Sequence, residues 1–80
     1  MRIYKAIVEF CDGKHSIHRF TREQIASFVY NFRKQSKNVF GDLLLFHVYG
    51  EQYIILNYVR KVEFYDELTM DEYLTIDREN

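Results

Sequence analysis

The stretch that most constrains the fold is LLLFHVYGEQYIIL, from Leu43 to Leu56, because it reads as two strands that are apolar on both faces. A two-residue turn at Gly50-Glu51 would pair Tyr49 with Gln52. In this register one face carries Leu44, Phe46, Val48, Tyr53, Ile55 and Asn57, and the other carries Leu43, Leu45, His47, Tyr49, Gln52, Ile54 and Leu56. An antiparallel hairpin commonly keeps one polar face toward water. The second apolar face therefore needs a cover.

The first twenty residues predict a β-hairpin. Side chains alternate in polarity along Arg2–Phe10, with the even-numbered residues facing inward. Asp12-Gly13 is a strong turn signal, since glycine adopts positive φ without a steric cost. A two-residue loop there would pair Val8 with Ile17 and Ile7 with His18.

The segment FTREQIASFVYNFRKQ, which follows this hairpin, predicts the main helix. Thr21 and Gln24 have the spacing of a capping box. An apolar stripe recurs at helical spacing and consists of Ile25, Phe28, Val29 and Phe32. This stripe would pack the helix onto one face of a sheet.

The remaining elements complete an α+β pattern. A strand is expected over Val59–Tyr65, and Thr69 with Glu72 predicts a capped C-terminal helix from Met70 to about Ile76. The order is then β-β-α-β-β-β-α, an antiparallel sheet of about five strands with one main helix packed on one face. A small, bent β-barrel capped by the helix is the alternative. Residues 1–80 are expected to form a single domain.

The second face of the Leu43–Leu56 hairpin is the predicted interaction surface. A helix of about 14 residues is about 21 Å long and covers only the middle of a sheet roughly 24 Å wide. A large apolar patch left in water is unusual for a monomer. The surface that we expect to bind a protein partner or a second copy in a homodimer consists of Leu43, Leu45, His47, Tyr49, Gln52 and Ile54. Curling of the sheet onto itself is the competing explanation.

Charge is distributed unevenly along the chain. Residues 1–65 hold 10 basic and 6 acidic residues, a net of +4, whereas residues 66–80 hold one basic and 6 acidic residues, a net of −5. This acidic C-terminal segment predicts a second contact, with a basic groove on a target, through Asp66, Glu67, Asp71 and Glu72. A segment kept soluble by its charge is the alternative.

Catalytic and metal chemistry find little support in the residues. The run CDGKHSIH contains Cys11, His15 and His18, but the two histidines of the predicted hairpin point to opposite faces. Zinc needs three or four converging ligands, and a Cys–His pair needs hydrogen-bond reach. No glycine-rich phosphate loop or paired-carboxylate arrangement is present. We expect no catalytic residue, metal or cofactor, and not an enzyme.

Nucleic-acid binding is the alternative function. The candidate basic patch consists of Arg33, Lys34, Lys37, Arg60 and Lys61. A net charge of +4 over the body is weak for a dedicated binder, and the acidic segment would repel phosphates.

The first hypothesis is a non-enzymatic protein–protein interaction module. The chain is short, has one cysteine and is 18% aromatic. In this overall character it resembles small accessory proteins of phages and mobile elements, and the resemblance implies that it binds and inhibits a host protein or defence complex. One cysteine fits a reducing compartment, and neither a signal peptide nor a long apolar run is visible, so we expect a cytoplasmic protein without membrane contact.

Overall fold

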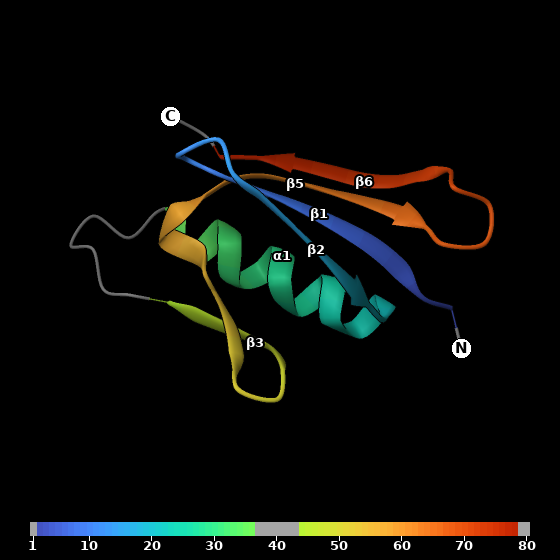
Figure 1. Cartoon of the computed structure of the whole chain (residues 1–80), viewed down its shortest axis with the longest axis horizontal. Coiled ribbons are helices and arrows are strands. Elements are labelled where there is room, and N and C mark those ends of the chain that lie inside the picture. The colour runs from blue at the N-terminus through green and yellow to red at the C-terminus, as the bar shows by residue number, and fades with distance from the viewer. Residues whose placement is uncertain (1, 37–43, 79–80) are drawn as a thin grey trace.

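The computed structural model describes residues 2–36 and 44–78, which form one helix, six strands and a short 3-10 helix. In chain order the elements are β1 (Tyr4–Phe10), β2 (His15–Phe20), α1 (Arg22–Ser36), β3 (Leu45–Tyr49), β4 (Gln52–Ile55), the 3-10 helix η1 (Leu56–Tyr58), β5 (Val59–Asp66) and β6 (Glu72–Asp77). The α+β class expected from the sequence is therefore confirmed (Figure 1).

The strands form two separate antiparallel sheets. Four strands pair in the order β2-β1-β5-β6, and β3 pairs only with β4. Figure 1 shows α1 against one side of the four-stranded sheet, with the β3–β4 hairpin beside the helix. Neither sheet closes on itself among the described strands, so the bent barrel is not the architecture.

The β1–β2 hairpin confirms the inward face of β1 and corrects the predicted pairing. Tyr4, Ala6 and Val8 are buried, as the alternation indicated. Ile7, however, pairs with Ile17 rather than with His18. The loop is one residue longer than predicted, because Gly13, at φ +87°, donates its N–H to the carbonyl of Phe10. This bond is typical of a three-residue loop with glycine in the left-handed region.

Helix α1 begins as the sequence predicts. The Thr21 N–H donates to Oε1 of Gln24 at 2.8 Å, and the Gln24 N–H donates to Oγ1 of Thr21 at 3.2 Å. These reciprocal bonds are a capping box and satisfy backbone donors that the first turn leaves without helical partners. The predicted stripe packs inward, with Ile25, Phe28 and Phe32 buried.

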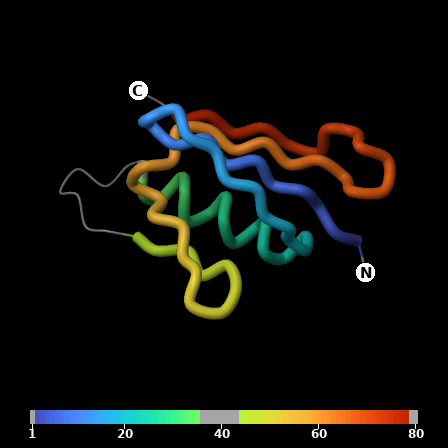
Figure 2. The backbone as a smooth tube through the Cα atoms, in the orientation of Figure 1, coloured from blue at the N-terminus to red at the C-terminus, as the bar shows by residue number. Residues whose placement is uncertain are grey.

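The C-terminal segment forms a strand, so the predicted helix from Met70 to Ile76 is wrong. Asp66 organises the turn that precedes β6, where its Oδ1 accepts the N–H groups of Leu68 and Thr69 at 2.8 and 3.3 Å. Residues 72–77 then pair with β5. Because Leu74 and Ile76 alternate with polar residues, they also fit a strand, and pairing satisfies the free edge of β5. Figure 2 shows the loop between β5 and β6 at the end of the sheet where β1 begins.

One aromatic core joins all the layers. Phe20 of β2 lies 5.8 Å from Phe28 of α1 and 5.6 Å from Phe46 of β3, measured between ring centroids. Phe64 of β5 lies 6.0 Å from Phe28. Tilted and edge-on contacts at these distances suit the charge distribution of aromatic rings. The core therefore fixes the β3–β4 hairpin against both α1 and the four-stranded sheet.

Candidate functional site

The outer face of the β3–β4 hairpin is an exposed aromatic surface, which we call the hairpin face and define as Leu45, His47, Tyr49 and Tyr53. Its apolar and aromatic side chains are largely in solvent: Leu45 is 57% exposed, Tyr49 79% and Tyr53 55%. His47 lies 5.2 Å from the Tyr53 ring and 2.6 Å, through Nε2, from the carbonyl oxygen of Gly50. The histidine thus connects the tip of the hairpin to its middle.

The opposite side of the same hairpin is anchored in the core. Phe46 and Ile54 are buried and form a cross-strand pair. At its base, the Leu56 N–H donates to the carbonyl of Leu44, and the Leu44 N–H donates to Oδ1 of Asn57, both at 2.9 Å. Side chains on an anchored strand pair lose little freedom when they bind a partner, which lowers the cost of binding.

Ile54 does not belong to the predicted surface. That side chain is 2% exposed and faces the core, whereas it was expected to lie beside Leu45. The cause is a register irregularity between His47 and Tyr49, which leaves Tyr49 opposite Gln52 but shifts the remaining pairs by one residue. A bulge of this kind reverses the faces of the strand beyond it. Tyr53 therefore takes the outer position that the sequence analysis gave to Ile54.

The other predicted residues of this surface are partly retained. Leu45, His47 and Tyr49 are exposed on the hairpin face, and Gln52 is exposed near its tip. Leu43 lies outside the described residues. No sequence signal marked the bulge, because both possible faces are apolar and the alternation fits either register.

The four acidic residues divide into two pairs with different surroundings. The Asp66 carboxylate accepts a hydrogen bond from Arg2, which holds the pKa of Asp66 below its ordinary value. Glu67 lies 2.7 Å from Nε of Arg19. Both are therefore engaged within the chain. Asp71 and Glu72 are exposed around the start of β6.

The candidate basic patch is spread over separate elements. Arg33 and Lys34 lie in the last turn of α1, on the helix side of the sheet, and Lys37 lies outside the described residues. Arg60 forms an ion pair with Glu9 at 2.7 Å, and Lys61 forms one with Glu63 at 3.2 Å. These carboxylates offset the positive charge on β5. Nucleic-acid binding stays a prediction, with no added support from this arrangement.

The cysteine and histidines of the first hairpin also lie apart. Cys11 is exposed in the loop, His15 faces the outer side of the sheet beside Glu9, and His18 is half-buried on the inner side. Burial lowers the pKa of His18, and its Nε2 lies 2.8 Å from the Ser16 hydroxyl. Within residues 2–36 and 44–78, no three cysteine, histidine or acidic side chains come together as a metal site.

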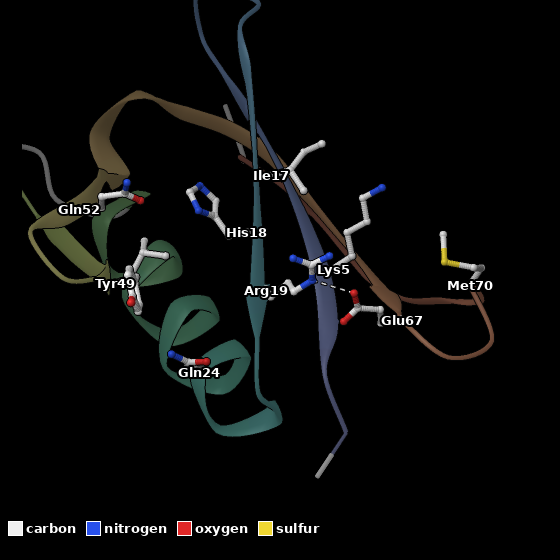
Figure 3. A pocket seen from close by; sticks show the side chains of 10 residues that line it. Lys5, Ile17, His18, Arg19, Gln24, Tyr49, Gln52, Glu67 and Met70 are labelled. Carbon is white, nitrogen blue, oxygen red and sulfur yellow. Dashed lines mark hydrogen bonds and ion pairs between the residues drawn. The ribbon is translucent and has the colours of Figure 1, made fainter.

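A groove runs beside β2 and reaches the tip of the hairpin. Figure 3 shows β2 with Ile17 and Arg19 on one side of the strand and His18, Tyr49 and Gln52 on the other. The groove holds about 540 Å³ and is open to solvent. The sequence analysis did not identify it, because it arises where the hairpin tip lies near an unpaired strand edge.

Comparison with known proteins gives no family. A scan against protein-family models finds no match, and searches of curated proteins and of solved structures find no significant similarity. In the part of the chain that the structure describes, no helix combines the length and the apolar character needed to cross a membrane.

Proposed function

We propose that this chain is a non-enzymatic protein-binding module whose primary contact is the hairpin face. The supporting observation is the exposure of Leu45, Tyr49 and Tyr53 on a hairpin that the core holds firmly in place. Tyrosine is enriched at the centres of protein interfaces, where its ring supplies contact area and its hydroxyl group finds a polar partner. The partner surface would be an apolar pocket with a polar rim.

The charge pattern supports a second contact on the same partner. Asp71 and Glu72 are exposed and could meet a basic rim, with Glu72 accepting a hydrogen bond from the Thr75 hydroxyl, whereas Asp66 and Glu67 already bind arginines within the chain. Complementary charge at the rim mainly accelerates association.

Inhibition of a host enzyme or defence complex is the consequence that we propose for such binding. We place this binding in the cytoplasm, where an unpaired cysteine such as Cys11 is stable. We also propose that the free chain is a homodimer.

The test is affinity capture from the native host with matched bait variants. Leu45→Glu places a charge on the hairpin face, and Tyr30→Glu places the same charge at an exposed aromatic residue of α1. We expect the wild type and Tyr30→Glu to retain the same host protein. The amount retained by Leu45→Glu should be lower by about tenfold or more. Equal retention by all three baits, or retention of nothing by the wild type, would refute the assignment. Circular dichroism of each bait confirms that it is folded.

A further inference from the structure

β2 lies at one edge of the four-stranded sheet. Among residues 2–36 and 44–78, no strand pairs with β2 on the side away from β1. The Phe10 N–H donates to the Lys14 carbonyl at 2.8 Å, and antiparallel pairs alternate between bonded and non-bonded. Ile7 and Ile17 are therefore a non-bonded pair. The backbone groups of His15, Ile17 and Arg19 point away from β1 and toward the free edge.

The other edge of the sheet is interrupted by a bulge, whereas β2 is regular. β6 has the acidic residues Glu72 and Asp77 at its ends, and its pairing with β5 is irregular between Phe64 and Tyr65. Charges and bulges on an edge strand discourage pairing with another chain. β2 instead has a regular register and an apolar side chain, Ile17, that is 62% exposed at its centre.

We propose that β2 pairs with β2 of a second copy of this chain, antiparallel, about a twofold axis that passes beside Ile17. This inference rests on the proposed homodimer and locates its interface. Ile17 would face Ile17 of the second copy, and His15 would face Arg19 of the second copy. These pairings join residues whose backbone groups point outward. The axis repeats the His15–Arg19 pair, so the pairs would form roughly six hydrogen bonds and one continuous sheet of about eight strands.

Side-chain complementarity favours this register over its neighbours. Ile7 already lies across from Ile17 within the chain, so the axis creates a row of isoleucines that crosses both copies. A shift of two residues would place Ile17 against His15 or Arg19 and leave it more exposed. Apolar cross-strand pairs stabilise a sheet, whereas mismatched pairs do not.

The charged groups beside the isoleucine row have partners within each copy. Nε of Arg19 lies 2.7 Å from Glu67, and His15 lies 3.2 Å from Glu9, which also pairs with Arg60. Glu67 therefore offsets the charge of Arg19 where it approaches His15 of the second copy. On the inner side, an open groove of about 540 Å³ lies between β2 and the hairpin tip (Figure 3).

The first measurement is the molar mass by light scattering over a concentration series up to about 1 mM. A strand pair alone buries less than a standard interface, so we expect dissociation in roughly the micromolar range or weaker. Ile17→Lys should be a folded monomer, because the residue lies mainly in solvent and its loss leaves the core intact. Leu68→Lys is the matched control, with the same added charge at an exposed residue of the β5–β6 loop, and should remain a dimer.

The second measurement is hydrogen exchange of single backbone amides in β2. At about 90% dimer, the amides of His15, Ile17 and Arg19 should exchange about tenfold more slowly than in the Ile17→Lys monomer. The amides of Ser16 and His18, which face β1, should be protected in both proteins. This odd–even pattern cannot arise from a dimer formed through the hairpin face.

Three results would overturn the proposal. The first is a wild-type monomer at every concentration. The second is a dimer whose odd-numbered β2 amides exchange as fast as in the Ile17→Lys variant, and the third is a series of larger open-ended species. Leu45→Glu separates this proposal from the binding function, because it should reduce capture of a partner about tenfold or more and leave the β2 dimer unchanged.

Discussion

Replacement of Arg78 should cause a large loss of stability, because this one side chain contacts three elements, α1, η1 and β5. Its Nη1 donates to Oε1 of the buried Gln35 at 2.6 Å, its Nη2 to the carbonyl of Leu56 at 2.6 Å, and its Nε to the carbonyl of Val59 at 2.8 Å. The guanidinium carbon also lies 5.3 Å from the centre of the Phe32 ring. Arg78 is thereby fixed to α1 and to the base of the β3–β4 hairpin.

The magnitude follows from the acceptors that would lose their donor. Arg78→Met retains much of the apolar stem and removes all these hydrogen bonds. A hydrogen bond from a charged donor contributes about 1.5–3 kcal/mol, and a buried acceptor left without a partner costs a similar amount. Because Arg78 is only half-buried and water can replace part of the loss, we expect a decrease of about 3 kcal/mol in the free energy of unfolding. The whole domain is expected to have about 4–12 kcal/mol.

The assay is urea unfolding at neutral pH, followed by tyrosine fluorescence and far-ultraviolet circular dichroism. Arg60→Met is the matched control, because Arg60 forms only an exposed ion pair with Glu9, and it should lose less than about 1 kcal/mol. A double-mutant cycle with Gln35→Met should give a coupling of about 1–2 kcal/mol between Arg78 and Gln35. A loss below 1 kcal/mol for Arg78→Met, or a coupling near zero, would refute the reasoning.

Two further predictions concern the backbone and the response to acid. Met70 has a φ of +62°, so Met70→Gly should raise the free energy of unfolding by about 0.5 kcal/mol, whereas Gly13→Ala should lower it. An unchanged or lower urea midpoint for Met70→Gly would contradict this. The folded state lowers the pKa of His18 through burial and that of Asp66 through its hydrogen bond from Arg2. As the pH falls, the unfolded chain therefore binds these protons at a higher pH than the folded chain does. The free energy of unfolding should fall below about pH 6.5 and again below about pH 4. His18→Gln should remove the first step, and a midpoint that does not change between pH 7 and pH 5 would contradict the assignment.

Local patterns were sufficient to predict most of the framework. The alternation along β1 identified the buried Ala6 and Val8, and the spacing of Thr21 and Gln24 located the start of α1. These features depend on neighbours within a few residues, where the geometry of a strand or a helical turn leaves little choice. Exposure of Leu45 and Tyr49 followed from the same kind of pattern.

The errors occurred where a segment had two acceptable local structures. Residues 70–76 carry both a helical spacing of apolar residues and a strand alternation, and pairing with β5 selected the strand. Ile54 and Tyr53 could each have faced the core, since both faces of the hairpin are apolar. The bulge beside Val48, fitted against the aromatic core, buried Ile54 and exposed Tyr53.

The sequence alone thus determined the class of fold, the inward face of β1 and the helix start, because those depend on short-range periodicity. The tertiary structure decided the registers, the last strand and the free edge of β2. Each of these depends on which distant segment supplies the partner for a strand's backbone groups, and a strand's own residues do not encode that partner.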